Sequence, residues 1–483
     1  MVSEGDDPRV LVDAMKSRGY RIANMYACEG MGSGDRALEI ILVCPGDVVR
    51  VTTRIDSSFT SLAPENPETS LYEREIWEMH GVRPIGHPDL RPLRMRTRTE
   101  GWWPMSKSPR PDRPAETIGI PPNGVTGEGV FEIPVGPVHA GIIGPGHFRF
   151  SVAGEPILRL RVYLGYSHRG IERMLETPFS RNNSRMAERI AGDSCVAHGL
   201  AYAQALESNT EVPVRAGYIR TVCAELERIS CHFGDIAGAA QDGGFAVPAA
   251  YGEGLREKTM RLNEFLTGSR MLMNIIVPGG VRRDIPDGKF EAIENRVMKI
   301  KYDLDELMEM LTETPSYMDR AETTGTLSRA AAEEVGAVGP VARASGVAAD
   351  VRKDNPYEIY DRLSMKMAVR GGGDVLSRVM VRADEVTESV SLILQCLNRM
   401  EDGPIRSEDV AYRDGFYLGM TEAPRGELMH CIHVRKGMIW RYRVRDPSFC
   451  NWPALEAAVM GNIVPDFPLI NKSFGLSYSG NDL

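Results

Sequence analysis

The stretch FEAIENRVMKIKYDLDELMEML, residues 290–311, decides the fold class of the larger part of this sequence. Its large apolar residues recur at steps of three and four positions, and they are Phe290, Ile293, Val297, Ile300, Leu304, Leu307 and Leu311. A helix with about 3.6 residues per turn places all of them on one face. The sequence therefore predicts a long amphipathic helix that packs against other helices.

Other helical and β-rich stretches surround this helix. The helical ones are 197–206, 221–236, 384–400 and a helix that begins near Gly254 and is stopped by Pro278-Gly279-Gly280. Alternating apolar residues predict the strands of a small antiparallel sheet at 131–139, 147–154 and 157–166. Residues 130–483 are thus expected to form a mainly helical bundle with an antiparallel β-hairpin or sheet.

The first 98 residues predict a separate small α/β domain. Residues 7–18 have helical spacing, and residues 38–43 and 48–55 are rich in β-formers. Residues 99–129 are rich in Pro, Arg, Ser and Gly and contain few large apolar residues, which is typical of a linker. The predicted fold class is α+β, with a domain at 1–98, a linker at 99–129 and a second domain at 130–483.

Composition excludes several classes of protein. The 483 residues include 57 Lys and Arg against 66 Asp and Glu, a net charge of −9, and 42% are hydrophobic. These are the proportions of a globular chain of about two or three domains, not of a disordered, collagen-like or disulfide-rich one. The acidic balance argues against a nucleic-acid partner. No apolar segment follows Met1 and no apolar run reaches about 18 residues, so neither export nor a membrane span is expected.

The eight cysteines are widely spaced, and no two lie within four positions of each other. The sequence therefore contains no CxxC pair, the local signature of a zinc ribbon, a thioredoxin site or a self-contained iron–sulfur cluster. Four of the nine histidines, by contrast, fall within sixty residues, at His139, His147, His168 and His198. They predict either a metal or proton-transfer site or a set of structural histidines.

Two further groupings combine arginines with carboxylates. Arg343 and Asp350 lie among small residues, and Glu422 and Arg425 flank a proline. Buried Arg–carboxylate pairs orient a site or shift its pKa values, but they also join domains, and the spacing favours neither role. The glycine-rich run at 370–375 lacks the strand-to-helix pattern and the lysine of a phosphate site, and it favours a turn between helices.

Ordered sequence blocks resemble a known family. YEREIWEMHGVRPIGHPDLRPL (72–93) resembles the signature of the 30-kDa subunit of respiratory complex I. From about residue 130 onward the sequence resembles the complex I 49-kDa subunit and the large subunit of group 4 membrane-bound [NiFe] hydrogenases. The matching blocks include GPVHAGIIGPGHFRF (136–150), GYSHRGIER (165–173), ERIAGDSCVAHGLAYAQALE (188–207), EAPRGE (422–427) and NIVPDFPLINKSFGLSYSGNDL (462–483). The fused arrangement looks most like formate-hydrogenlyase-type large subunits.

The resemblance implies where a nickel–iron centre would be held. Active hydrogenases of this kind bind the two metals with four cysteine thiolates in two CxxC pairs, and thiolates are the soft ligands such metals need. Here those positions fall on Ala191, Ser194, Ser477 and Gly480, while Cys195 and Cys450 lie outside them. The proton-accepting glutamate of the hairpin segment is replaced by Gly144. The resemblance therefore implies that hydrogen activation has been lost.

Complex I offers quinone binding as an alternative. There a tyrosine in the first ligand segment and a histidine on the β-hairpin bind the quinone headgroup. Gly192 lies near the tyrosine position, whereas His139 matches the histidine of the GPxH segment. Quinone binding is weakened but stays open, because Tyr163, Tyr166 or Tyr202 could line the same cavity.

The resemblance thus implies a large subunit of a membrane-associated oxidoreductase complex without a nickel–iron centre. Electrons from a [4Fe-4S] cluster in a partner subunit would enter a cavity between hairpin and bundle. They would pass to an unknown acceptor, with quinone as one candidate, or drive ion translocation. The expected site residues are His139, His147, His168, Asp193, His198, Glu422 and Arg425, with Arg343, Asp350 and Glu172 as a supporting polar network. A helix N-cap is the other role open to Asp193.

Two other functions stay open, a redox-inactive assembly scaffold and, as the least favoured, an active hydrogen-evolving hydrogenase. No metal or cofactor is expected on this chain itself. The expected partners are a PSST-like iron–sulfur small subunit, a ferredoxin-like subunit, and antiporter-like and other membrane-arm subunits. The N-terminal domain and the linker are expected to dock the chain onto such partners at the cytoplasmic face of the membrane.

Overall fold

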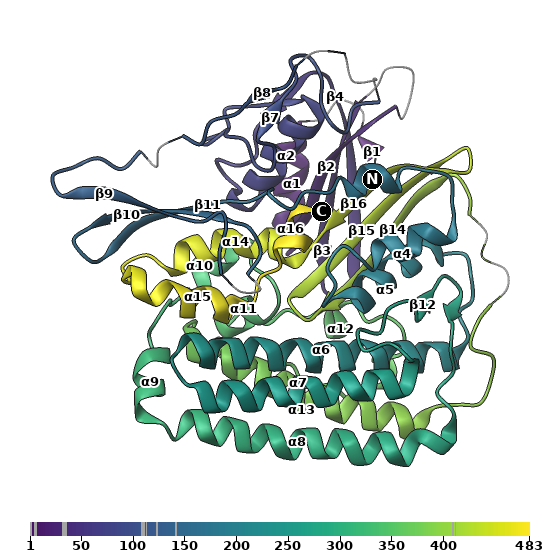
Figure 1. Cartoon of the computed structure of the whole chain (residues 1–483). Coiled ribbons are helices and arrows are strands. Elements are labelled where there is room, and N and C mark those ends of the chain that lie inside the picture. Colours follow the sequence, from purple (N-terminus) through teal and green to yellow (C-terminus); the bar gives the residue numbers. More distant parts are fainter. Residues whose placement is uncertain are drawn as a thin grey trace.

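The computed structural model describes residues 2–3, 7–30, 36–107, 112, 114–121, 124–140, 143–407, 410 and 412–483. Figure 1 shows an N-terminal sheet with its helices at the top, a sheet of long C-terminal strands in the middle and a slab of long helices at the bottom. An arm of β-strands extends from one side. The mixed α+β architecture agrees with the predicted fold class.

The N-terminal domain is built on a four-stranded sheet with the order β1-β4-β3-β2. Its strands are β1 (Val2–Ser3), β2 (Arg21–Glu29), β3 (Arg36–Cys44) and β4 (Asp47–Ile55). Helices α1 (Pro8–Lys16) and α2 (Ser70–His80) pack on one face, where Val12, Ile40 and Ile76 share a core. The predicted helix at 7–18 and the strands at 38–43 and 48–55 are confirmed.

The second face of this sheet packs on another sheet, which the sequence does not predict. Its antiparallel strands are β14 (Gly415–Ala423), β15 (Gly426–Arg435) and β16 (Met438–Arg445). Tyr26 and Ile41 of the N-terminal sheet contact Met429 and Cys431 of β15. Strands β2 and β15 are buried along almost their whole length, so they lack the apolar–polar alternation that marks a half-buried strand. Sheet-on-sheet packing therefore joins the two domains.

The arm is the predicted small antiparallel sheet. Its strands are β9 (Val130–Val135), β10 (His147–Ala153) and β11 (Ile157–Tyr163), in the order β11-β10-β9. Phe148 and Phe150 of β10 meet the ring of Phe467 edge-on, with centroid distances of 5.0 and 4.8 Å. These aromatic contacts fix the base of the arm against the C-terminal helices.

Long helices form the lower slab in Figure 1, and they are α6 (Val214–Asp242), α7 (Ala246–Thr267), α8 (Phe290–Thr312) and α13 (Val375–Arg399). Helix α8 is confirmed, with Ile293, Val297 and Leu304 buried. The helix predicted to begin near Gly254 and to be stopped by Pro278-Gly279-Gly280 has its end wrong. Helix α7 ends at Gly268, which takes a left-handed φ of +76° and donates its N–H to the Glu264 carbonyl at 2.8 Å.

The remaining elements are short. They are β5 (Ser58–Thr60), η1 (Pro67–Thr69), β6 (Arg83–Ile85), β7 (Thr97–Arg98), β8 (Glu116–Thr117), α3 (Ile171–Leu175), α4 (Arg181–Ala187), α5 (Cys195–Leu206), β12 (Ile276–Val277), β13 (Gly280–Val281), η2 (Asp287–Lys289), α9 (Pro315–Ala321), α10 (Arg329–Glu334), α11 (Gly339–Ala344), α12 (Val351–Asp354), η3 (Tyr360–Arg362), α14 (Pro447–Ala458), η4 (Val464–Asp466), α15 (Phe467–Phe474) and α16 (Tyr478–Asp482).

The first part of the predicted linker lies on the N-terminal domain. The N–H of Met105 donates to the carbonyl of Met79 at the end of α2 (3.0 Å), and the Met105 side chain is buried. Several linker positions lie outside the described residues. Within the described ranges, no helix is both long and apolar enough to cross a membrane.

Candidate functional site

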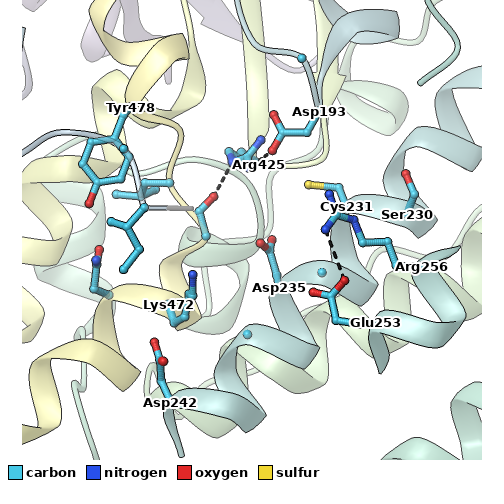
Figure 2. Close-up of a pocket in the computed structure, with 18 of the residues that line it drawn as sticks. Asp193, Ser230, Cys231, Asp235, Asp242, Glu253, Arg256, Arg425, Lys472 and Tyr478 are labelled. Atoms are coloured by element: carbon cyan, nitrogen blue, oxygen red, sulfur yellow. Dashed lines mark hydrogen bonds and ion pairs between the residues drawn. The ribbon is translucent and has the colours of Figure 1, made fainter. Parts of the chain in front are cut away.

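A cavity of about 400 Å³ lies where the arm, the helices and the C-terminal segment meet (Figure 2). It is bounded by the turn between β9 and β10, the loop before α5, the helices α6 and α7, and the residues around α15 and α16. Its lining includes His139, Gly144, Asp193, Glu227, Cys231, Arg256, Arg425, Lys472 and Tyr478. Charged and aromatic side chains therefore share one space beside the two segments expected to hold metal ligands.

Arg425 joins those two segments. It lies in the turn between β14 and β15, and its side chain is nearly buried. Its guanidinium donates to Ser194 Oγ (3.1 Å) and Asp193 Oδ2 (2.6 Å), and its Nε donates to the carbonyl of Gly475. Charge-assisted bonds of this kind hold the 191–194 loop and the 475–480 segment side by side.

Asp446 occupies the space beside Gly480. Its carboxylate accepts the N–H of Ser448 (2.8 Å) as the N-cap of α14, and it lies 3.3 Å from Nε2 of His198. A Cβ added at Gly480 would overlap this carboxylate. A cysteine at position 480 therefore requires Asp446 to move.

The four expected ligand positions do not fit a nickel–iron centre. Ser194 Oγ accepts the Arg425 bond, and Ser477 Oγ accepts the N–H of Gly480 (3.0 Å) as the cap of α16. Ala191 and Gly480 carry no ligand atom at all. In the part of the chain that the structure describes, no group of three or more His, Cys, Asp or Glu side chains is placed to hold a metal ion. The donor set lacks the thiolates that such a centre requires.

Tyr478 fills the place that a side chain at position 144 would take. A Cβ at Gly144 would lie 2.7 Å from Cγ of the Tyr478 ring, and a Cβ at Gly146 would lie 2.7 Å from its Cε1. Ordinary carbon contacts are about 3.5–4.0 Å, so neither position accepts a side chain while the ring is there. A glutamate at 144 and this placement of Tyr478 exclude each other.

Of the seven expected site residues, the structure places His139, Asp193 and Arg425 at the cavity. His139 donates its Nε2–H to the carbonyl of Gly146 (2.7 Å). Asp193 pairs with Arg425, and the N-cap residue of α5 is Ser194. The structure therefore gives Asp193 an ion pair rather than the alternative role of a helix cap.

The other three histidines lie outside the cavity. His147 donates from Nδ1 to the carbonyl of Gly136 (3.2 Å) at the base of the arm. His168 donates from Nδ1 to the carbonyl of Asp482 (2.6 Å), and His198 is fully buried beneath the 191–194 loop. The sequence brings these residues close in number, but the structure separates them because each is fixed by a different backbone or side-chain partner.

The tyrosines proposed for quinone binding lie elsewhere as well. Tyr163 and Tyr202 are buried outside the cavity, and Tyr166 lies under the guanidinium of Arg96. The tyrosine that lines the cavity is Tyr478. The sequence offers no local signal for it, since its place depends on the two glycines of the distant hairpin.

Comparison with known proteins agrees with this architecture. The family model described as "Respiratory-chain NADH dehydrogenase, 49 Kd subunit" matches residues 242–414 and 406–482. The model described as "Respiratory-chain NADH dehydrogenase, 30 Kd subunit" matches residues 12–114. The chain belongs to the complex I 49-kDa and 30-kDa subunit families.

The relatives of this chain include hydrogenase subunits and fused complex I subunits. Hydrogenase-4 component G of Escherichia coli K12 is 34% identical over 449 residues, which cover 90% of this chain and 78% of the relative. Formate hydrogenlyase subunit 5 of the same organism is 32% identical over 459 residues, 90% and 79% of the two chains. The C/D subunit of NADH-quinone oxidoreductase from Phocaeicola vulgatus is 31% identical over 461 residues, 89% and 88%. The resemblance of the sequence blocks is confirmed.

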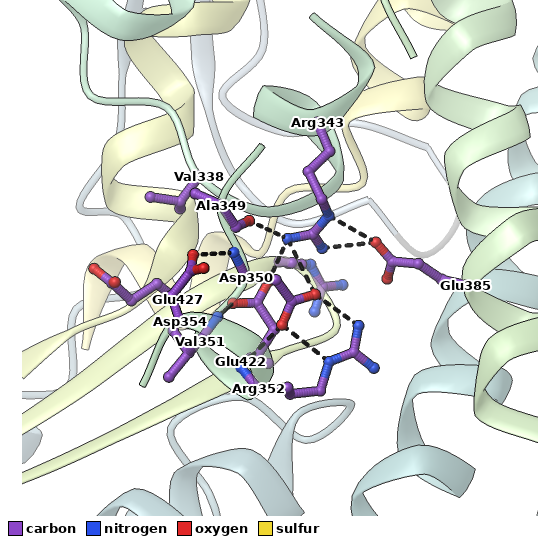
Figure 3. A network of polar contacts seen from close by, with 12 residues as sticks. Val338, Arg343, Ala349, Asp350, Val351, Arg352, Asp354, Glu385, Glu422 and Glu427 are labelled. Atoms are coloured by element: carbon purple, nitrogen blue, oxygen red, sulfur yellow. Dashed lines mark hydrogen bonds and ion pairs between the residues drawn. The ribbon is translucent and has the colours of Figure 1, made fainter. Parts of the chain in front are cut away.

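A buried polar network in the 49-kDa domain supports the strand that leads to Arg425 (Figure 3). Arg343 is fully buried and donates to Glu385 Oε1 (2.6 Å) and Glu422 Oε1 (2.9 Å). Arg228 of α6 donates to the carbonyl of Glu422 (2.7 Å). Glu422 lies at the end of β14, directly before the turn that carries Arg425. The network therefore fixes the point from which Arg425 reaches the cavity.

Asp350 and Glu172 of the 49-kDa domain do not line the cavity. Asp350 accepts bonds from Arg352 (2.8 Å) and faces a second hollow of about 300 Å³ between the two domains. Glu172 accepts bonds from Arg441 and from the N–H of Val444, both 2.9 Å, against strand β16. Both carboxylates are thus compensated by cations of their own.

His198 begins a buried hydrogen-bonded chain. Its Nδ1 lies 3.0 Å from Nε2 of His430, and Nδ1 of His430 lies 2.7 Å from the hydroxyl of Tyr442. Burial, followed by the neighbouring His198, lowers the pKa of His430 well below its ordinary value. The Tyr442 hydroxyl can donate to Nδ1 of His430, and Nε2–H of His430 can then donate to Nδ1 of His198. Nε2 of His198 lies 3.3 Å from the Asp446 carboxylate without forming a hydrogen bond. The sequence did not single out His430, Tyr442 or Asp446.

Glu227 is a cavity residue that the sequence did not single out either. It lies on α6, and its carboxylate accepts the N–H groups of Val196 (2.6 Å) and Ala197 (3.0 Å) at the start of α5. It therefore caps the helix that follows the 191–194 loop. Burial raises its pKa from 4.5 to about 8, although the two N–H bonds act in the opposite direction. The sequence signal that could have found it is the placing of glutamates at 225 and 227 among apolar residues of one helix.

Glu227→Gln is expected to change how stability depends on pH. In the folded chain the pKa is about 8 against an ordinary 4.5, so the folded state holds a proton that the unfolded state releases. The stability this provides is complete below about pH 4.5 and is lost as pH rises through about 8. Relative to the glutamine variant, the wild type should lose up to about 1.4 kcal/mol per pH unit in this window. Urea unfolding at pH 5, 6, 7 and 8 measures it, and parallel curves for both proteins would contradict the assignment.

Proposed function

We propose that this chain is the large subunit of a membrane-associated, complex I-like oxidoreductase that works without a nickel–iron centre. In this function electrons arrive from a [4Fe-4S] cluster of a partner subunit and leave to an acceptor in the cavity, or their arrival is coupled to ion translocation. The observation that supports the proposal is the set of contacts made where metal ligands are expected. Arg425 and Asp446 occupy, with their own ion pairs and hydrogen bonds, the space between the two former ligand segments.

The cavity has the hydrogen-bonding groups that an acceptor such as a quinone would need. His139 and Tyr478 line it together, one from the arm and the other from the C-terminal segment. A tyrosine and a histidine are the groups with which complex I holds a quinone headgroup. The Tyr478 hydroxyl can donate a hydrogen bond to a carbonyl oxygen, whereas Nδ1 of His139 can accept one from a reduced headgroup, because its Nε2–H already bonds the Gly146 carbonyl. Here Tyr478 takes the tyrosine role that the sequence left unassigned. Attachment to the cytoplasmic face of the membrane would come through the partner subunits.

Analysis of the purified native assembly tests this function. We expect no stoichiometric nickel on the chain and an iron–sulfur signal that is reoxidised through the cavity. Tyr478→Phe and His139→Gln should each slow that reoxidation by about tenfold, since the first removes a hydrogen-bond donor from the cavity and the second removes the ring nitrogen that can accept one. His147→Gln and Tyr163→Phe are matched controls outside the cavity, and they should leave the rate unchanged.

Other outcomes select the alternatives. Stoichiometric nickel would mean that the ligand positions are wrongly assigned and that the chain is a hydrogenase. An unchanged rate in both cavity variants, with the assembly intact, would favour a redox-inactive scaffold. The readout is spectroscopic, so it does not depend on knowing the physiological acceptor.

A further inference from the structure

A further, open hollow of about 550 Å³ lies on the far side of segment 269–275 from the cavity. We name it the arginine hollow after Arg185, Arg189, Arg282 and Arg283, which line it together with smaller polar and apolar residues. All four arginines are exposed. No Asp or Glu is among the described residues that line it, although the whole chain carries a net charge of −9.

None of these arginines forms a close ion pair within the described parts of the chain, although the buried Glu188 carboxylate attracts Arg185, Arg189 and Arg282 from nearby. Arg189 donates to the carbonyl of Arg185 and Arg283 to the carbonyl of Thr267, both at 2.8 Å. No ion pair involves any of the four among the described residues. The nearby carboxylate of Glu188 is 1% exposed and accepts the N–H of Asn274 (2.8 Å), and burial raises its pKa to about 7. The hollow is therefore a concentrated positive surface on an acidic protein.

The arginine hollow is structurally connected to the candidate site. Arg169 donates to the carbonyls of Arg189 (2.9 Å) and Ser479 (2.9 Å), so it links the hollow to the C-terminal ligand segment. Leu272 lines the cavity and Asn274 lines the hollow, and both have left-handed backbone angles, with φ of +57° and +61°. Such angles in non-glycine residues are strained and persist where the surroundings impose them. One constrained segment thus has the cavity on one side and the hollow on the other.

We propose that the arginine hollow is the docking site for an acidic segment on the surface of a partner subunit. This deepens the proposed function and rests on it, because it names the surface by which a partner is held beside the site. Guanidinium groups bind carboxylates with two parallel hydrogen bonds, and charge complementarity of this kind selects the partner and speeds association.

The geometry favours a protein surface over a free small anion. A single anion on exposed arginines stays hydrated and is screened by salt. A protein surface covers several arginines at once, excludes water from them and gains from all of them together. The open shape of the hollow leaves room for such a surface.

Charge reversal in the full complex tests the proposal. Arg185→Glu together with Arg282→Glu should weaken binding of the partner subunits by at least about tenfold at low salt, and raised salt should weaken the wild-type complex in the same way. The matched control is Arg362→Glu with Arg399→Glu, two exposed arginines of which Arg399 likewise donates to the carbonyl of Arg362. The control should keep the wild-type affinity. A photo-crosslinker at Arg283 should label an acidic peptide of a co-purified subunit.

Three results would overturn the proposal. They are an affinity that is unchanged by the reversal, a loss that is equal in the control, and a crosslink to a peptide without acidic residues. Binding of inorganic phosphate to the full chain that depends on Arg185 and Arg282, with assembly unaffected, would likewise replace the partner surface by a small anion. The nickel content and the reoxidation rate are measured on the same preparations, so failure of the docking surface is distinguished from failure of the proposed function.

Discussion

Arg343→Met is expected to lower the free energy of unfolding by about 3–5 kcal/mol. The Arg343 guanidinium is fully buried and donates to Glu385, to Glu422 and to the carbonyl of Ala349 (2.7 Å). Methionine keeps much of the volume but leaves the carboxylates of Glu385 and Glu422 without this cation. A buried charge that loses its partner retains the full cost of its removal from water. Urea unfolding followed by near-ultraviolet circular dichroism measures the change.

Arg370→Met is the matched control. Arg370 also pairs with a carboxylate, that of Asp384 at 2.6 Å, but the two side chains are 43% and 38% exposed. Water replaces most of what this pair contributes, so the loss should stay within about 1 kcal/mol. If Arg343→Met were no more destabilising than Arg370→Met, the buried network would not be holding the end of β14.

Gly419→Ala is expected to cost more than about 3 kcal/mol or to prevent folding. Gly419 lies on β14 where α5 crosses it, and an added Cβ would overlap the carbonyl oxygen of Ala201 and lie 2.7 Å from its carbonyl carbon. Backbone atoms cannot rotate away as a side chain can, so the helix and the strand must separate. Helix α5 carries His198 and follows the 191–194 loop, and the candidate site should therefore be displaced with it.

Gly254→Ala provides a control with the opposite sign. Gly254 lies within α7, no atom lies within 4 Å of the Cβ position, and its backbone is helical. Alanine favours the helix over glycine, so the variant should gain up to about 1 kcal/mol. The same glycine-to-alanine change is thus expected to stabilise α7 and to disrupt the packing of α5 on β14. A similar loss in both variants would mean that the close approach of α5 to β14 is wrong.

The elements that the sequence predicts are those with one buried face. Helix α8 and the strands of the arm show their period directly, because their second face meets water or only part of the protein. Strands β2 and β15 are buried on both faces, and the polar residues of β15, such as Glu427 and His430, are paired inside. A period of two cannot be read from such strands, so the sheet that joins the two domains was not predicted.

The parts of the candidate site that lie within single sequence blocks could be predicted. The family blocks located Ala191, Ser194, Ser477 and Gly480, and the structure brings their two segments together. The replacements around them come from distant positions. Asp446 matters because it lies against Gly480, and Tyr478 because its ring lies on Gly144 and Gly146. These relations depend on the tertiary fold, and no local spacing encodes them.

The hydrogen bonds that run from Tyr442 through His430 to His198 have a direction. Each ring nitrogen in this hydrogen-bonded chain can donate or accept but not both at once, so the chain has a polarity. If His430 accepts from His198 instead of donating to it, its other nitrogen must donate to the Tyr442 oxygen, so the two hydrogen bonds reverse together. The two hydrogen bonds therefore have two possible directions and share one direction at a time. The two bonds thus link His198, which lies beside Asp446, to Tyr442 in the sheet on which the N-terminal domain packs.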